Sequence, residues 1–133
     1  MSLAVRAAAT WLALLVVMFG NGVFRVLVLQ PRLGEDRARQ LASLTGLVIV
    51  FVAAWIFVRA QAGVGPHALL GVGALWLLLT LAFEFGFGYF VSGLSWAELV
   101  ADYNVVQGRL WPFVLLGTLV APWVWGRLRQ RVA

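Results

Sequence analysis

The segment LLGVGALWLLLTLAFEFGFGY, residues 69–89, is apolar along its whole length except for one carboxylate, that of Glu84. A helix needs about 20 apolar residues to cross the hydrocarbon core of a bilayer. Three further apolar segments of comparable length are residues 7–29, 41–58 and 110–125. A segment in lipid must satisfy its own backbone hydrogen bonds, and the alternating pattern of a membrane β-barrel is absent. The chain is therefore predicted to be all-α: an integral membrane four-helix bundle that forms one domain over residues 1–133.

The composition agrees with a membrane protein. Of the 133 residues 63% are hydrophobic and 11% are charged, whereas roughly a quarter of the residues in soluble proteins are charged. The first apolar segment follows Arg6, as in a signal peptide, but no small-residue cleavage signal appears and the apolar character continues through Phe24. We therefore expect a retained span. Cysteine is absent, which excludes disulfides and thiolate metal sites. The use of Arg without Lys, with many Ala, Gly and Val residues, suggests a bacterial genome of high GC content.

Four spans would place both chain ends and residues 61–67 on one side of the membrane, called here the terminal side. Residues 30–40 and 92–108 would lie on the other, the loop side. Arginines are shared evenly between the two sides, so the rule that cytoplasmic flanks are basic gives a tie. If Arg25 and Arg109 are paired inside the protein and discounted, the termini are cytoplasmic. The near balance leaves a dual topology open. Because the net charge of +5 sits beside spans, the expected partner is membrane lipid and not nucleic acid.

The connection SWAELVADYNVVQG, residues 95–108, has the pattern of a short amphipathic helix. Ser95 and Glu98 have the spacing of a capping box. Apolar side chains recur at helical intervals, at Trp96, Leu99, Val100, Tyr103 and Val106. The segment is too polar to span, so a helix over about residues 96–106 is predicted to lie at the membrane interface, between the third and fourth spans.

Two charged residues inside apolar segments have matching depth. Arg25 and Glu84 each lie on the order of 6 to 8 Å below the loop-side end of their segment, at 1.5 Å per residue. An isolated charge is costly there, so an ion pair between them is predicted. Neighbouring polar residues at or near this depth extend the prediction to one polar pocket, roofed by the interfacial helix and formed by Asn21, Arg25, Thr80, Glu84, Asp102, Tyr103, Asn104 and Arg109.

Simpler interpretations remain open for these residues. Arg25 can extend to the headgroups, Glu84 can be protonated or paired locally, and Asp102 with Arg109 can merely fix a loop. His67 stands alone in a turn, so no metal or cofactor site is predicted. Tryptophans near span ends suit an interfacial belt, whereas two deeper ones are expected to pack inside. The belt set is Trp11, Trp96, Trp111, Trp123 and Trp125, and the packing set is Trp55 and Trp76.

Two similar hexapeptides, FGNGVF at residues 19–24 and FGFGYF at residues 85–90, lie about half a chain apart. Each is followed by a polar connection and another apolar segment. Two parallel helix-pair repeats would explain this spacing, as in some membrane transport proteins.

The stretches NGVFRVLVLQPRLGEDRARQLASLTG, FEFGFG and SWAELVADYNVVQGRLWP together resemble a family of small bacterial four-span membrane proteins with no assigned activity. The resemblance extends over most of the chain and implies four spans, but no substrate. The chain is also similar in size to small multidrug exporters and fluoride channels, whose motif patterns it lacks.

The leading functional hypothesis is a non-enzymatic protein of the bacterial inner membrane whose Arg25 and Glu84 site binds or passes a small solute or couples to protons. The second is a structural or accessory subunit, with a homo-oligomer or a membrane partner protein, whose charge pair fixes helix packing. The third is a lipid-modifying enzyme that uses Glu84 or Asp102, which is disfavoured because no nucleophile–base pair or metal cluster is evident. A water-lined cavity that reaches Glu84 would favour the first hypothesis, a dry Glu84 beside a flat apolar outer surface the second, and a lipid-shaped groove that ends at two carboxylates the third.

Overall fold

A computed structural model of the chain describes residues 2–61, 63–91, 93, 95–101 and 110–132. These residues are helical almost throughout, and no strand occurs among them. The elements are α1 (Leu3–Phe24), η1 (Arg25–Leu29), α2 (Gln30–Leu33), α3 (Glu35–Ala60), α4 (Pro66–Gly86), η2 (Phe87–Val91), α5 (Trp96–Ala101) and α6 (Trp111–Val132). The segments η1 and η2 are π-helical and continue α1 and α4 without a break. The all-α prediction is confirmed.

Three continuous helices are long and apolar enough to cross a membrane: Leu3–Leu33, Glu35–Ala60 and Pro66–Val91. Large apolar side chains on their outer faces are exposed, including Phe90 at 82% and Leu27 at 69%. The fourth long helix, α6, has 22 residues and carries three arginines in its last two turns. That α6 also spans, and that the fold is a four-span bundle, stays a prediction.

The helices are longer than the apolar segments that predicted them. Proline usually stops a helix, but the first helix runs on through Pro31 to Leu33. The π-helical turn before it explains the difference. In this turn the Gln30 N–H donates to the Arg25 carbonyl, five residues back, so the bonding has already left the α pattern when the proline, which lacks an N–H, is reached. The helix ends instead at Gly34, whose φ of 85° is one that glycine adopts readily.

Helix α6 lies between α3 and α4, and α1 packs against α3 and α4. The core of described residues surrounds Trp76 and Leu69, both fully buried. Gly73 of α4 makes the closest helix contact, because a Cβ atom there would lie 1.8 Å from the Leu119 carbonyl oxygen of α6. A second close approach lies at Gly46 of α3, where a Cβ atom would lie 2.9 Å from Met18 Cε of α1. Small residues thus let the helices pack tightly, as is common in membrane proteins.

Tryptophan side chains join the helices by hydrogen bonds. Trp11 of α1 donates to Thr80 Oγ1 of α4 at 3.0 Å, and Trp76 of α4 donates back to the Ala7 carbonyl of α1 at 2.9 Å. Trp125 of α6 donates to a carbonyl of α3 at 2.9 Å. The packing role predicted for Trp76 is confirmed. Trp11 and Trp125 are half-buried helix contacts and not free members of a belt, because each indole N–H has an acceptor inside the protein.

Trp55 was predicted to pack inside the protein but lies at its surface. It is 42% exposed and lies under the Arg59 guanidinium, 5.1 Å from the ring centroid. The aromatic residue of this part of α3 that does pack in the core is Phe57, which lies edge-on against Trp76.

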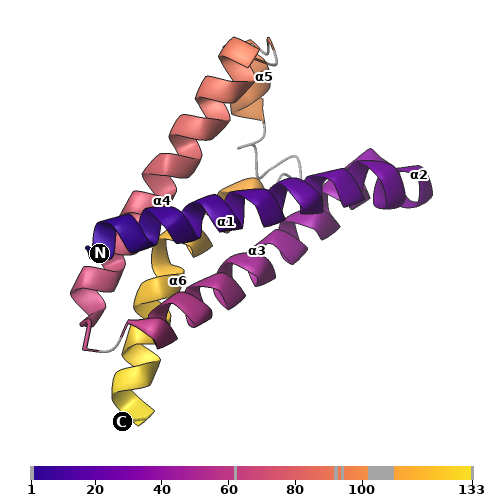
Figure 1. Ribbon diagram of the computed structural model, residues 1–133. Coiled ribbons are helices and arrows are strands. Elements are labelled where there is room, and N and C mark those ends of the chain that lie inside the picture. The colour runs from indigo at the N-terminus through magenta and orange to yellow at the C-terminus, as the bar shows by residue number, and fades with distance from the viewer. Residues whose placement is uncertain (1, 62, 92, 94, 102–109, 133) are drawn as a thin grey trace.

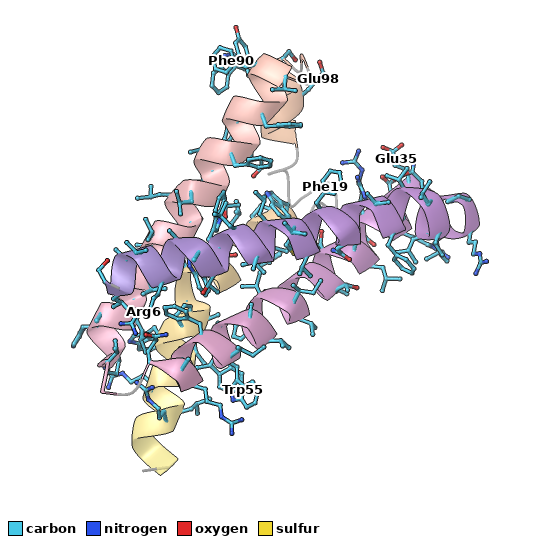
Figure 2. All side chains as sticks on the ribbon, viewed as in Figure 1. Arg6, Phe19, Glu35, Trp55, Phe90 and Glu98 are labelled. Atoms are coloured by element: carbon cyan, nitrogen blue, oxygen red, sulfur yellow. The ribbon has the colours of Figure 1, made fainter. Side chains whose placement is uncertain are left out.

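The two ends of the molecule differ in packing. Both chain ends and the α3–α4 turn gather at one end (Figure 1). There Arg129 of α6 donates hydrogen bonds to the carbonyls of Val58, Gln61 and Val64, which closes this turn against α6. Toward the loop side α1 and α3 diverge from α4, so that Glu35 and Glu98 lie at the far ends of separate arms (Figure 2). The fold is therefore closed at the terminal side and spread at the loop side.

Candidate functional site

A cavity of about 650 Å³ occupies the space where the helices diverge. Its walls come from α1 with η1, α3, α4 with η2, and the start of α6. Four of the eight residues predicted to form a polar pocket line it: Asn21, Arg25, Thr80 and Glu84. The other four, Asp102, Tyr103, Asn104 and Arg109, lie outside the described residues. The structure thus brings the described half of the predicted set to one cavity, and that this cavity is a functional site stays a prediction.

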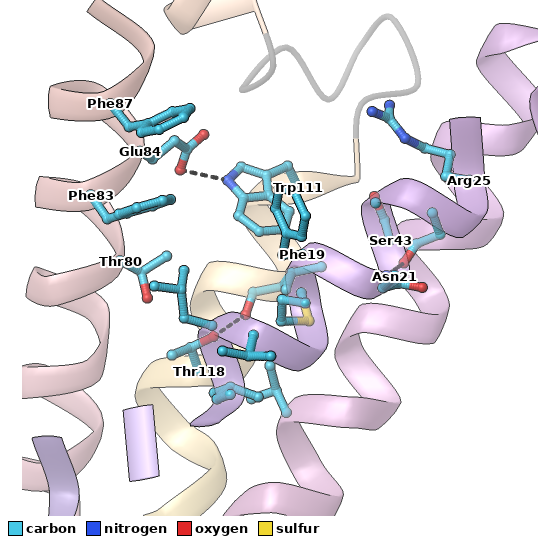
Figure 3. A pocket seen from close by; sticks show the side chains of 18 of the residues that line it. Phe19, Asn21, Arg25, Ser43, Thr80, Phe83, Glu84, Phe87, Trp111 and Thr118 are labelled. Atoms are coloured by element: carbon cyan, nitrogen blue, oxygen red, sulfur yellow. Dashed lines mark hydrogen bonds between the residues drawn. The ribbon is translucent and has the colours of Figure 1, made fainter. Parts of the chain in front are cut away.

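Glu84 stands on the α4 wall of the cavity. Its side chain points inward with those of Thr80, Phe83 and Phe87 (Figure 3). Its Oε2 atom accepts a hydrogen bond of 2.9 Å from the indole Nε1 of Trp111, at the start of α6. A hydrogen bond to a charged group is among the stronger ones in proteins. Glu84 therefore fixes the start of α6 against α4 while it faces the cavity.

Arg25 stands on the opposite wall, with Asn21 and Ser43 (Figure 3). It is half-buried at the first residue of η1. Asn21 donates from Nδ2 to the Ala42 carbonyl at 3.0 Å, so its amide joins α1 to α3. Arg39 of α3 lines the same wall and bridges to Glu35 at 2.9 Å.

Among the described residues, no salt bridge joins Arg25 to Glu84, although the sequence predicted one. The one salt bridge that joins two of them is Arg39–Glu35. Figure 3 shows Trp111 between Arg25 and Glu84, which face each other across the cavity. Both residues make further interactions in the structure, so neither charge is isolated. Equal depth in the sequence was thus not enough to pair them, because their helices diverge at this level.

The cavity is deep and its chemistry changes with depth. Along α1 it extends from Arg25 to Trp11, about 21 Å at 1.5 Å per residue. Its charged lining residues, Arg25, Arg39 and Glu84, all lie toward the loop side. The deep end is apolar and aromatic and stops at the layer where Trp11 is bonded to Thr80. Small-molecule sites are mostly apolar with a few polar groups, and the lining of this cavity has that character.

Both π-helical segments border the cavity. Arg25 begins η1, and Phe87 and Gly88 belong to η2. Short π-helical turns within α-helices are frequent at functional sites. The two segments lie in or directly after the similar hexapeptides of the sequence, which places the same irregularity near the loop-side end of two long helices.

Sequence reasoning missed Arg39, Ser43 and Trp111 as cavity residues. Trp111 had a detectable signal, since it follows Arg109 at the predicted membrane entry of the last span. Arg39 and Ser43 lie four residues apart on α3, with Gly46 three residues further on. That spacing puts Arg39 and Ser43 on the same face of α3 as Gly46, which packs against α1, so they lie on the face toward α1.

The predicted helix after the third apolar segment is present in its described part, and its position at the membrane interface stays a prediction. Helix α5 begins at Trp96, as the capping box predicted. Ser95 N–H donates to Glu98 Oε1 at 3.3 Å, and Glu98 N–H donates to Ser95 Oγ at 3.2 Å. Helix α5 ends at Ala101, and the remainder of the predicted helix lies outside the described residues. Over the described part of the chain no group of three His, Asp or Glu side chains is placed to hold a metal ion.

No protein-family model matches the chain, and neither the curated proteins nor the solved structures contain a similar one. Functional inference therefore depends on the cavity itself.

Proposed function

We propose that this chain is a non-enzymatic, multi-pass protein of a bacterial inner membrane, with cytoplasmic termini, that binds or passes a small solute or couples to protons through the cavity between Arg25 and Glu84. The observation that carries the proposal is the cavity itself. Its volume of about 650 Å³ falls in the range of small-molecule sites. It reaches Glu84.

Helices that only fix one another's packing would have little reason to leave this space. In a structural subunit the charged residues would be enclosed by neighbouring helices, because interiors are packed to high density. Here Glu84 is half-buried and borders an open volume. This observation favours a binding or transport role over the role of an accessory subunit.

Cysteine labelling tests whether water fills the cavity. The chain has no cysteine, so a single introduced thiol is labelled without background. Ser43 lines the cavity, and Thr45 is exposed two residues further along α3, on nearly the opposite face of the helix. The Ser43→Cys and Thr45→Cys variants therefore form a matched pair at nearly equal depth.

In membrane vesicles a membrane-impermeant thiol reagent should label the Ser43→Cys variant from the loop side and leave the Thr45→Cys variant, which faces lipid, unlabelled. Labelling of neither variant, in protein that is folded by circular dichroism, would show a dry cavity and overturn the proposed route for a polar solute or proton. The accessory-subunit hypothesis would then be the better one.

A further inference from the structure

We propose that a second, smaller pocket, where α4 and η2 meet the start of α5, binds the trimethylammonium group of a phosphatidylcholine headgroup. This pocket has a volume of about 220 Å³ and is lined by Phe85, Gly86, Tyr89, Phe90 and Trp96. Among the described residues it shares no lining residue with the larger cavity. The inference therefore goes beyond the proposed function and does not depend on it.

Aromatic rings form most of the wall of this pocket. The ring of Trp96, at the start of α5, has its centroid 5.8 Å from that of Phe85 and 5.4 Å from that of Tyr89. Tyr89 in turn packs edge-on against Phe90, at 5.1 Å between centroids. Trp96 is 59% exposed and Phe90 is 82% exposed, so two of the four rings that line the pocket keep much of their surface uncovered.

Gly86 keeps space free between the rings. It lines the pocket, and a Cβ atom placed on it would have no heavy atom within 4 Å. A larger residue at this position would therefore fill part of the pocket without a clash against the protein. The pocket depends on a missing side chain, and that dependence can be tested.

The chemistry of the lining favours a quaternary ammonium group. Aromatic faces attract cations, and pockets lined by several rings are used to bind choline-like groups. A primary ammonium group carries three N–H donors, whereas of the five lining residues Tyr89 alone has a side-chain oxygen to accept one. Donors that enter the pocket unpaired cost free energy, and a trimethylammonium group has none. The volume is also below the range of about 300–1,000 Å³ for drug-sized ligands, which suits a small headgroup cation.

The charge of the surrounding segment also favours a cation. The chain as a whole has a net charge of +5. Residues 85–108, in contrast, include Glu98 and Asp102 and contain no Arg, Lys or His. Glu98 is exposed on α5, two residues after Trp96. The local field therefore attracts a cation and repels an anion.

The position of the pocket favours a lipid headgroup over a free solute. Phe85 and Phe90 lie at the C-terminal end of Pro66–Val91, one of the helices long and apolar enough to cross a membrane. Val91 is 69% exposed and apolar, whereas Glu98 is exposed and charged. Figure 2 shows Phe90 and Glu98 at the end of the same arm. A change from exposed apolar to exposed charged residues, with Trp and Tyr between them, is typical of the headgroup level of a bilayer.

Native mass spectrometry of the protein purified in detergent tests the inference, because it resolves individual lipid adducts. The probes are phosphatidylcholine and phosphatidylethanolamine with identical acyl chains. Both are zwitterionic, so the arginines of the chain act on them alike, and the two probes differ in the methylation of the ammonium group. The Kd of the first adduct should be about fivefold lower for phosphatidylcholine. Tetramethylammonium chloride should displace that adduct, and sodium chloride at the same concentration should not.

Two variants with matched controls locate the headgroup. Gly86→Ala fills the pocket and Phe90→Leu removes an exposed ring, so each should abolish the preference for phosphatidylcholine and leave the Kd of phosphatidylethanolamine unchanged. Gly71→Ala is the control for the first, since Gly71 is exposed on the same helix and also has no atom near a Cβ position. Phe24→Leu is the control for the second. Phe24 has the place of Phe90 in the other hexapeptide, is 51% exposed, and lines neither the pocket nor the cavity. Both controls should keep the preference.

Equal affinity for the two lipids would overturn the inference. So would a preference that survives both Gly86→Ala and Phe90→Leu, in protein that is folded by circular dichroism, or one that the control variants abolish as well. Binding of tetramethylammonium without any preference between the lipids would mean that the pocket takes a soluble cation, and would overturn the assignment to a lipid headgroup.

Discussion

Among single residues, Glu84 shows how a carboxylate is kept in an apolar segment. Its Oε2 atom accepts the indole N–H of Trp111 at 2.9 Å, and its side chain borders the cavity. A charge in hydrocarbon must be paired, protonated or reached by water. Glu84 combines a hydrogen bond across two helices with access to open space, which explains its place so close to the loop-side end of α4.

The partner of Glu84 can be measured with two double-mutant cycles. Replacing Trp111 by Phe and Glu84 by Gln, singly and together, should give a coupling energy of about 1 kcal/mol or more, because hydrogen bonds to charged groups contribute roughly 1.5–3 kcal/mol. The parallel cycle of Arg25→Met with Glu84→Gln should give a smaller value. Thermal unfolding in detergent supplies both energies. A larger coupling in the Arg25 cycle would mean that the ion pair predicted from equal depth forms after all.

Among helices, the contact of α4 with α6 depends on one missing side chain. Gly73 allows the Leu119 carbonyl oxygen of α6 to approach to 1.8 Å from the position of a Cβ atom. The atom in the way is backbone, which cannot rotate aside as a side chain can. Any residue larger than glycine therefore has to push the two helices apart.

The neighbouring Gly71 supplies the control for this contact. It lies two residues away on α4, is exposed, and has no atom within 4 Å of a Cβ position. Gly73→Ala should lower the free energy of unfolding by about 1–3 kcal/mol, the usual range for overpacking. Gly71→Ala should be neutral or slightly stabilising, since alanine favours helix over glycine. Thermal unfolding of the two variants in the same detergent checks this, and equal melting temperatures would contradict the role assigned to Gly73.

For the whole molecule, the asymmetry between its two ends is the main feature. At the terminal side the core around Trp76 is fully buried, and Arg129 joins α6 to the α3–α4 turn. At the loop side the helices diverge around the cavity. The proposed binding role places ligand access at the loop side, so the orientation of the protein in the membrane decides which compartment it would serve.

We predict that the terminal side is cytoplasmic. The basic residues near the chain ends include Arg6 and Arg127, both exposed, whereas Arg25 is half-buried and borders the cavity. Only flanking arginines that are free to meet the headgroups count toward orientation. A reporter fused after Ala133 should therefore be active in the cytoplasm. A periplasmic signal would invert the proposed orientation, and equal signals on both sides would indicate dual topology.

The sequence by itself determined the long helices and the start of α5, but not where the long helices end, since they extend beyond the apolar segments. Residues 69–89 and the other apolar segments predicted helices, and Ser95 with Glu98 predicted the start of α5, because these features depend on neighbouring residues and on the 3.6-residue period. The sequence also predicted how deep each polar residue lies in its apolar segment. It gave nearby depths for Asn21, Arg25, Thr80 and Glu84. Only the tertiary structure decided which of them meet. Crossing angles and close contacts such as that of Gly73 set the direction in which each helix faces its neighbours, and these are properties of packing between distant segments. Packing therefore brought Trp111 within hydrogen-bond distance of Glu84. The divergence of α1 from α4 left a cavity between Glu84 and Arg25.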